Sequence, residues 1–464
     1  MTARPQIVLV LGIGGPALDY ALPRLARRGD VHVLCVVDPS PFNRRAVEAC
    51  AATVVVAPVT PATTHAELVT AIERFARGCG ADAVLTFSEY AVHAVADACE
   101  RLGLRGAGPD AMRSRDKWAM RSTWERAAVP GPRFVRVDDV EDLRRACDIL
   151  DLPFLLKPAL SAGSIGQQIV RGPEDVAGAY ARSRQGLRAA ADEGDIEYGA
   201  ADVDHLLAED IIRSSSDGWY DDPRYGDYVS VEGIVADGAY HPICITSRLP
   251  TIAPFTELSN QAPCVLPEAL QRAIEATARA AVDALELGTC ATHTEIKLMP
   301  GGGLSMIESA ARLPGAMVVR EVEEAWGVDL IGALADALLG NAEAIPASML
   351  VTGARRAAAS LALIATDSAG RPWASLPILD PARISWCDLV SPDTTVEIVE
   401  AQTLELGSRM PRYEASAGVL NFAGLLFVVA PDAATLLDDT LAILDGLEAQ
   451  LTRPEAAGAV PGGG

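Results

Sequence analysis

Two glutamates, Glu295 and Glu308, are spaced so that a β-hairpin would bring their carboxylates face to face. If Met299 and Leu304 close a four-residue turn over residues 300–303, the register sets Glu295 directly opposite Glu308. Opposed residues of an antiparallel pair have Cβ atoms about 4.5–5.5 Å apart. Like charges at that distance destabilise a sheet unless a cation lies between them, and such oxygen ligands suit Mg²⁺, which usually shares its shell with substrate phosphates. The hairpin therefore predicts metal–nucleotide chemistry. The alternative is an exposed edge hairpin with solvated glutamates.

Three further features fit an anionic substrate. Arg312 could supply a forked guanidinium to an anion. Lys157 ends an apolar strand, and the loop at residues 161–166 (SAGSIG) offers small residues whose backbone amides can approach phosphate oxygens. This loop is not the Walker pattern, because no Gly-Lys-Ser/Thr opens a helix, and a plain hairpin turn is the alternative. Lys117 at a helix start is a weaker candidate, since a lysine there is usually solvated.

The bulk composition narrows the function classes. The 464 residues allow two to four domains, and acidic residues outnumber basic ones 62 to 39. That balance argues against nucleic-acid or anionic-membrane surfaces, which need clustered Lys and Arg. The nine cysteines show no Cys-x-x-Cys pair and indicate reduced thiols. We find no signal h-region and no stretch near the roughly 20 apolar residues of a membrane helix, so we expect a cytoplasmic protein.

Alternating strands and helices over the first hundred residues predict an open parallel α/β domain. Strands are expected at residues 7–11, 31–37, 53–57 and 83–87, with helices at 17–28 and around 66–77. The turn from Gly12 to Ala17 resembles a dinucleotide loop but lacks the third glycine, so a structural strand-to-helix turn is favoured.

The rest of the chain predicts mixed helices and strands. Asp237-Gly238 between two apolar runs indicates a hairpin, and Pro267 opens a long amphipathic helix. A single helix is expected over about residues 318–340. Residues 214–227 are expected to form an exposed loop or lid, and the tail at 454–464 is expected to fray.

The order of these features resembles the ATP-grasp superfamily, in which a nucleotide lies between two α+β subdomains. Several longer stretches resemble its bacterial L-amino acid ligase branch; they lie at residues 98–108, 115–117, 230–238, 292–299 and 307–312. The resemblance covers essentially the whole chain. It implies an N-terminal α/β domain at 1–113, an ATP-grasp domain at 114–344 with subdomains of about 114–204 and 205–344, and a C-terminal α/β domain with a flexible tail at 345–464.

The resemblance also implies roles for individual residues. ATP would be bound by Lys117, Lys157, Gly163 and Ser164 and by the hinge residues Glu209, Asp210, Ile211 and Ile212. Mg²⁺, as two ions, would be bound by Glu295 and Glu308. Arg312 would hold the substrate carboxylate and later the acyl phosphate as the catalytic cation. The amino-acid pocket would be lined by Glu89, Glu257, His293, Arg312, Gly315 and Ala316.

Two departures from related sequences matter. Most ATP-grasp enzymes have Asn two residues after the second metal glutamate, where this chain has Ala310, an alanine that the peptide-ligase branch shares. Ala316 stands where a bulky Trp occurs in the best-known relative, and Asn260 where it has His. Because hydrophobic pockets discriminate by about 1–3 kcal/mol per methylene, we expect a first substrate larger than alanine.

The sequence thus predicts an ADP-forming ligase that joins two amino acids through an acyl phosphate. A ligase with another acceptor, such as an amino-sugar, a polyamine or a non-proteinogenic amino acid, is the first alternative. A nucleotide-binding scaffold without turnover is the second, although the presence of Lys157, Glu295 and Glu308 argues against it. The expected partners are small amino acids, with no nucleic acid and no membrane; a homodimer is left open.

Overall fold

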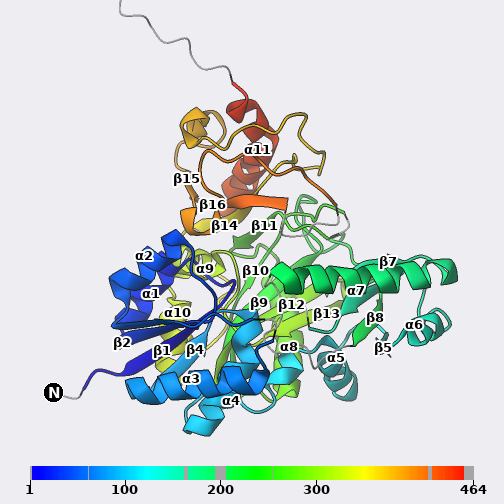
Figure 1. The fold of residues 1–464 in the computed structure, drawn as a ribbon. Coiled ribbons are helices and arrows are strands. Elements are labelled where there is room, and N and C mark those ends of the chain that lie inside the picture. Colours follow the sequence, from blue (N-terminus) through cyan, green and yellow to red (C-terminus); the bar gives the residue numbers. More distant parts are fainter. Residues whose placement is uncertain are drawn as a thin grey trace, which may run out of the picture.

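The computed structural model describes residues 3–60, 62–160, 166–193, 205–253, 255–415 and 421–453, and it contains four four-stranded sheets. Figure 1 shows them as an N-terminal α/β layer structure, two central antiparallel sheets and a C-terminal sheet backed by the helix that closes the chain. Mixed α/β architecture with one parallel and several antiparallel sheets is what the sequence predicted. Within the described chain, no helix combines the length and the apolarity that a membrane span requires.

The N-terminal sheet is parallel, with strand order β3-β2-β1-β4. Its strands are β1 (Gln6–Leu11), β2 (Asp30–Cys35), β3 (Thr53–Val56) and β4 (Ala83–Thr86). Its helices are α1 (Leu18–Ala26), α2 (Pro41–Cys50), α3 (His65–Cys79) and α4 (Val92–Leu102). Apolar side chains of α3 and α4 pack on the sheet, and α3 is the helix predicted around residues 66–77. The sequence did not predict α2, a largely polar helix whose buried residue is Val47.

The second sheet has strand order β5-β8-β6-β7 and is antiparallel. Its strands are β5 (Phe134–Val137), β6 (Phe154–Pro158), β7 (Gln168–Val170) and β8 (Leu206–Asp210), and the helices of this region are α5 (Lys117–Arg126), α6 (Val140–Ala146) and α7 (Val176–Glu193). Although the predicted subdomain boundary places β8 in the following subdomain, its hydrogen bonds to β5 and β6 place it in this sheet.

The third sheet, with order β10-β9-β12-β13, carries the glutamate hairpin. Its strands are β9 (Tyr228–Ala236), β10 (Ala239–Thr246), β12 (Cys290–Leu298) and β13 (Leu304–Ala310), and α8 (Glu268–Leu285) packs against it. The prediction that Glu295 lies opposite Glu308 is confirmed. The predicted closing pair was wrong, because Leu298 pairs with Leu304 and a bulge in β13 at Ile307 shifts the register back by one residue.

One predicted helix is two helices. The chain forms α9 (Val318–Trp326) and α10 (Leu330–Leu338) where the sequence predicted a single helix over 318–340. Gly327 ends α9 with a left-handed φ of 76°, which glycine adopts without a steric penalty. The Asp329 side chain then caps the second helix by accepting from the backbone N–H of Gly332.

The C-terminal sheet is antiparallel, with order β11-β14-β16-β15. It contains β11 (Ser259–Ala262), β14 (Ala357–Ile364), β15 (Thr395–Ile398) and β16 (Phe422–Ala430), and α11 (Ala433–Leu451) covers it. Strand β11 lies within the predicted ATP-grasp range yet pairs with β14. The short 3₁₀ segments are Glu89–Ala91, Ala111–Ser114, Pro173–Asp175, Pro300–Gly302, Pro381–Arg383, Trp386–Asp388 and Glu400–Gln402.

The segment at 214–227 has no regular structure, as predicted, but it is not simply exposed. Trp219 and Tyr225 are buried, and the Trp219 indole donates to the carbonyl oxygen of Met299 at 2.8 Å. Trp219 holds the segment against the glutamate hairpin, and Tyr225 packs into the core under the C-terminal sheet. The predicted fraying at 454–464 concerns residues outside the described chain.

Candidate active site

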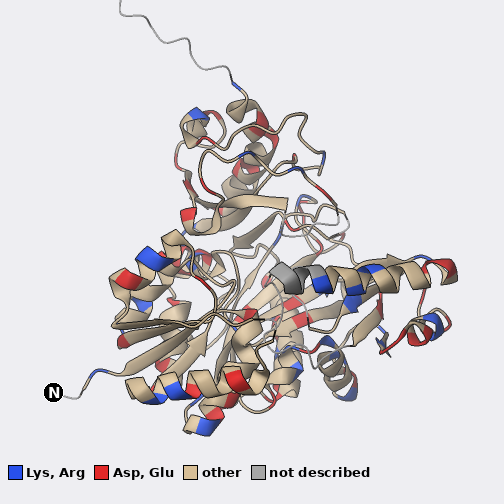
Figure 2. Ribbon diagram, in the orientation of Figure 1, with Lys and Arg blue, Asp and Glu red and all other residues tan. Residues whose placement is uncertain are grey.

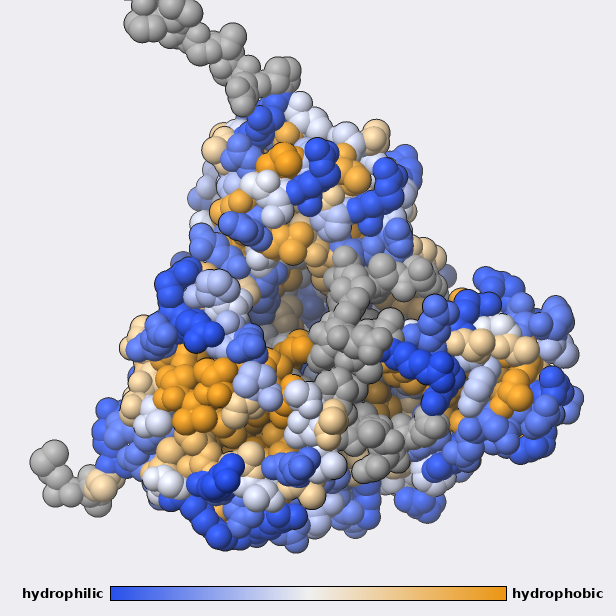
Figure 3. Space-filling model, viewed as in Figure 1, coloured by the Kyte–Doolittle hydropathy of each residue, from blue (hydrophilic) through white to orange (hydrophobic). Residues whose placement is uncertain are grey.

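A cavity of ≈ 630 Å³ lies between the second and third sheets and extends to the C-terminal sheet. Its walls come from β6 and β8 on one side, β12 and β13 on the other, and the end of β16 at the rim. Figure 3 shows the surface hollowed between the C-terminal domain and the domains below it. Figure 2 shows acidic positions on the central sheets as well as on the outer helices.

Most residues that the sequence singled out line this one cavity. They are Lys117, Lys157, Glu209, Asp210, Ile211, Ile212, Glu257, His293, Glu295, Glu308, Arg312, Gly315 and Ala316. Glu89 does not line it, although it contacts a residue that does. Gly163 and Ser164 lie outside the described residues, so their predicted part in ATP binding stays a prediction.

Lys157 enters the cavity from β6 as part of a buried three-charge cluster. Its Nζ lies 2.5 Å from Glu209 Oε1, and Arg121 Nε lies 3.0 Å from Glu209 Oε2. The side chains of all three are at most 5 % exposed. Burial alone would raise the pKa of Glu209, but Arg121 and Lys157 hold it at about 2. One carboxylate therefore faces two basic side chains on this wall, and burial lowers the pKa of Lys157.

Acid should destabilise the fold through two buried glutamates, Glu209 and Glu89. Glu209 and Glu89 both have a pKa of about 2 in the folded protein, below the value of about 4.3 for an unfolded glutamate. A lowered carboxyl pKa stabilises the fold above the unfolded pKa, and this contribution is lost as the pH falls towards 2. We expect the free energy of unfolding to fall by up to about 1.4 kcal/mol per pH unit for each of the two groups between about pH 4.5 and 2. Urea unfolding at stepped pH measures this, and a Glu209→Gln variant with the wild-type slope would contradict it.

Glu295 on β12 is held by a buried histidine. His293 Nδ1 lies 3.0 Å from both carboxylate oxygens of Glu232, and its Nε2 lies 3.5 Å from Glu295 Oε1. Burial opposes protonation of His293, but the charge of Glu232 outweighs it and raises the pKa to about 9. The resulting imidazolium orients Glu295 towards the cavity. The predicted contact of His293 with substrate remains a prediction.

Three carboxylates, those of Glu257, Glu295 and Glu308, line the same cavity as Lys157. Burial and the negative charge of Glu295 raise the pKa of Glu257. Glu308 lies across the strand pair from Glu295, and its Oε2 is 3.7 Å from Lys117 Nζ. Oxygen-only donors that repel one another are a set that a hard divalent cation such as Mg²⁺ would neutralise. The residues present therefore fit such an ion.

Arg312 lies at the end of β13 and is oriented by Glu89. The Glu89 carboxylate accepts from Arg115 Nη1 at 2.5 Å and forms an ion pair with Arg312 Nε. Burial opposes ionisation of Glu89, but Arg312 and Arg115 outweigh it and lower its pKa. Glu89 thus already pairs with two guanidinium groups, whereas the sequence predicted that it would line the amino-acid pocket.

Ala316 follows Arg312 at the cavity rim in a left-handed conformation, with φ of 52°. The side-chain amide of Gln402 reaches this turn: its Nε2 lies 2.9 Å from the carbonyl oxygen of Gly15 and 3.4 Å from that of Ala316. Gln402 therefore joins the N-terminal domain, the cavity rim and the C-terminal domain at one point.

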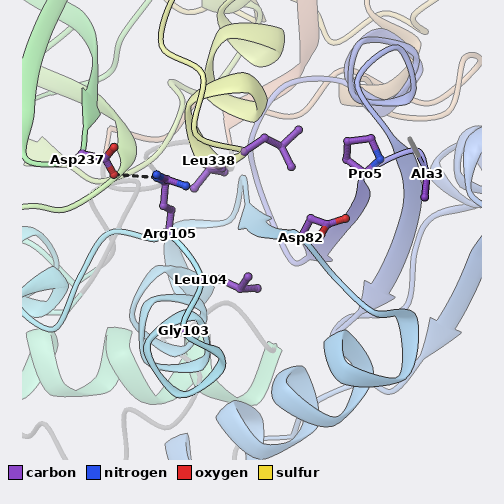
Figure 4. Close-up of a pocket in the computed structure, with 9 residues that line it drawn as sticks. Ala3, Pro5, Asp82, Gly103, Leu104, Arg105, Asp237 and Leu338 are labelled. Carbon is purple, nitrogen blue, oxygen red and sulfur yellow. Dashed lines mark hydrogen bonds and ion pairs between the residues drawn. The ribbon is translucent and has the colours of Figure 1, made fainter. Parts of the chain in front are cut away.

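A second cavity, of ≈ 670 Å³, opens below the N-terminal sheet. Figure 4 shows Arg105 paired with Asp237 at its edge, with Asp82 and Leu338 nearby. The Arg105 Nε–Asp237 Oδ1 distance is 2.8 Å, so both charges are already balanced. The lining of this second cavity contains none of the predicted site residues. Its slightly larger volume does not make it the better candidate.

Several residues of the site were missed by sequence reasoning. Arg121 pairs with Glu209, Glu232 pairs with His293, and Arg248 donates to the Ser230 hydroxyl. Glu232 and Arg115 lay inside stretches that carried the family resemblance, which was a signal for them. Arg121 and Arg248 gave none, because a lone arginine in a helix or strand usually lies on the surface.

Comparisons with known proteins agree with the geometry. Residues 26–106 match the ATP-grasp N-terminal domain. The alanine–anticapsin ligase of Bacillus subtilis is 37% identical over 286 residues, which are 61% of this chain and 60% of that protein. The chain thus aligns with less than two thirds of the length of this curated relative.

Solved structures show the same fold over nearly the whole chain. An L-amino acid ligase from Bacillus licheniformis superposes with a TM-score of 0.67 at 18% identity and covers 93% of this chain and 94% of its own. Carboxyaminoimidazole ribonucleotide synthase of Aspergillus clavatus, solved with ATP, gives 0.66 at 16% identity over 97% and 99%. The fold is therefore the ATP-grasp fold.

Proposed function

We propose that this chain, which has the ATP-grasp fold, is an ADP-forming carboxylate–amine ligase that joins two amino acids into a dipeptide. One observation carries the proposal: Lys117, Lys157, Glu295, Glu308 and Arg312 all line the same cavity. The similarity to alanine–anticapsin ligase supports amino acids as the substrates.

The side of the cavity that carries Lys157 and Lys117 would bind ATP. Lys157 and Lys117 would neutralise the phosphates, and the backbone from Glu209 to Ile212 would contact the adenine as the strand β8 leaves the sheet. Burial lowers the pKa of Lys157, and Glu209 opposes this shift and fixes the Lys157 side chain before the nucleotide arrives. Preorganised charge of this kind lowers the barrier because no side chain must reorient during phosphoryl transfer.

The side of the cavity that carries Glu295 and Glu308 would hold the metal ion. Glu295 and Glu308 would bind Mg²⁺, which neutralises charge on the phosphoryl group as it moves. His293 keeps Glu295 directed into the cavity. The prediction of two ions rests on these two glutamates, since Ala310, opposite His293 in the register, offers no side-chain oxygen.

The reaction would proceed in two steps. The carboxylate of the first amino acid, held by Arg312, attacks the γ-phosphorus of ATP, so that an acyl phosphate and ADP form. The amine of the second amino acid then attacks the acyl carbon, a proton leaves the nitrogen, and phosphate departs. The chain itself contributes positioning and the exclusion of water, which would otherwise hydrolyse the acyl phosphate.

The reaction class is tested by measuring phosphate release across a matrix of amino-acid pairs, with mass spectrometry of the products. We expect ADP, phosphate and a dipeptide in equal amounts for particular pairs. Phosphate release that needs a different amine would favour the alternative acceptor, and no turnover with any mixture would favour a scaffold. The homodimer stays a prediction that sedimentation analysis can test.

The first substrate is proposed to be larger than alanine because Ala316 leaves space at the rim. Replacing Ala316 with Trp should lower kcat/KM about 100-fold for first substrates with bulky side chains, whereas kcat/KM for alanine should be retained. Excluding two methylenes from the pocket is enough for a factor of that size. Steady-state kinetics with single amino acids in the first position measure it. Ala434→Trp, on the exposed start of α11, is the matched control. An unchanged preference in Ala316→Trp would contradict the proposal.

A further inference from the structure

A cluster of two histidines and an aspartate lies on the N-terminal domain, outside the cavity described above. His65 is the first residue of α3, and His93 and Asp97 are one turn apart on α4. The two helices pack side by side through apolar residues such as Leu68, Ile72 and Val95 (Figure 1). The packing therefore fixes the three polar side chains at one helix–helix seam.

The donor atoms of the cluster are close to the spacing of a metal site. His65 Nε2 lies 2.7 Å from Asp97 Oδ2, His93 Nε2 lies 3.7 Å from Asp97 Oδ1, and one ligand atom from each residue lies within 4.8 Å of the others. Ligands bound tetrahedrally at about 2.0–2.2 Å lie roughly 3.4 Å from one another. Side-chain movements of about 1.5 Å or less would therefore bring all three onto one ion.

The rings of the two histidines lie against each other. Their rings stack with centroids 4.2 Å apart and planes 22° apart, so two protonated rings would repel each other. Burial, and then the neighbouring His65, lower the pKa of His93, which favours the neutral imidazole. Arg115 acts in the same direction, but it is paired with Glu89. Neutral imidazoles and a carboxylate are the ionisation states of metal ligands.

A purely structural role explains less of the arrangement. Thr64 and Glu67 already form a capping box at the start of α3, so His65 is not needed as a cap. One hydrogen bond to Asp97 would require only one histidine. The side chains of His65, His93 and Asp97 are 28%, 24% and 29% exposed, which leaves access for an ion and for water as a fourth ligand.

We propose that His65, His93 and Asp97 bind one divalent transition-metal ion, zinc in preference, and that this ion clamps α3 to α4. Two imidazole nitrogens and a carboxylate oxygen suit Zn²⁺ and its neighbours, whereas the oxygen-only set at Glu295 and Glu308 suits Mg²⁺. The site is separate from the proposed ligase chemistry, so the two ideas stand or fall independently.

Calorimetric titration of the full chain with Zn²⁺, after treatment with a chelator and without nucleotide, tests the proposal. We expect the wild type to bind one more Zn²⁺ than the His65→Gln/His93→Gln double variant. Zinc bound by the nine cysteines cancels in this comparison, because both proteins contain them. His241→Gln, a partly exposed histidine elsewhere, is the matched control and should bind like the wild type.

Two further readouts keep the result interpretable if the double variant folds poorly. The single variant Asp97→Asn should lose the same ion, and saturating Zn²⁺ should raise the Tm of the wild type by at least about 2 °C more than that of Asp97→Asn. Co²⁺ bound at the site should show no thiolate charge-transfer band. Equal zinc stoichiometry in wild type and variants, or equal Tm shifts, would overturn the proposal.

Discussion

Replacement of Glu308 by glutamine is expected to lower kcat about 1,000-fold while the protein stays folded. Glutamine keeps the size of the side chain and its place opposite Glu295 but removes the negative charge that the proposed Mg²⁺ would bind. Loss of metal-based charge stabilisation costs several kcal/mol, and each 1.4 kcal/mol is a factor of ten in rate. Phosphate release at saturating ATP and amino acids is the measurement.

A control separates this effect from a general response to lost charge. Glu397 lies on β15, is 57% exposed and pairs with Arg320 at 2.9 Å. Glu397→Gln should keep the wild-type rate. A Glu308→Gln enzyme with more than about a tenth of wild-type kcat would show that this carboxylate is not a metal ligand.

Replacement of Glu209 by glutamine is expected to cost about 3–5 kcal/mol in the free energy of unfolding. The substitution leaves the buried cations of Lys157 and Arg121 without their counter-charge, and removing one partner of a buried ion pair is destabilising by that amount. Urea unfolding followed by tryptophan fluorescence measures it, with the indole of buried Trp124 next to Arg121 as a reporter.

The matched control for this second effect is Glu141→Gln. Glu141 also pairs with an arginine, Arg144, but its side chain is 60% exposed, so solvent screens the pair. Its unfolding midpoint should equal that of the wild type. A Glu209→Gln protein that is as stable as the wild type would contradict the view that one carboxylate balances both cations.

The metal hairpin could be predicted because its information is local. The alternation of apolar residues and the short glycine-rich turn predict a hairpin within a span of fourteen residues, and the bulge at Ile307 offsets the one-residue error in the predicted turn, so that Glu295 lies opposite Glu308. The bulge at Ile307 could not be read in the same way, because an unpaired residue in β13 depends on packing against the rest of the sheet. The prediction of the pair was correct even though the predicted closing pair at the turn was wrong.

The charges that support the site could not be predicted, because their partners are far apart in sequence. Glu209 meets Arg121 across 88 residues, and His293 meets Glu232 across 61. From the sequence alone, such residues are expected at the surface or in substrate binding, because only the tertiary fold brings the partners together. Glu89 illustrates the consequence: it was expected to line the amino-acid pocket, and its pairing with Arg312 could not be predicted.

Helix boundaries show a related limit. Hydrophobic periodicity continues from residue 318 to 340, so one helix was predicted, but Gly327 and the Asp329 cap divide it. The glycine and the aspartate were visible as a stop and a start signal. In the structure these two signals prevail over the periodicity, so the prediction of a single helix was wrong.

In the proposed reaction, ATP phosphorylates a carboxylate before an amine attacks it. The most direct test uses a first amino acid whose carboxylate is labelled with ¹⁸O, incubated with ATP, Mg²⁺ and the second amino acid. An acyl-phosphate path transfers one ¹⁸O atom into inorganic phosphate, with ADP and a dipeptide as the other products. Label found in AMP, or phosphate released without ¹⁸O, would contradict the account.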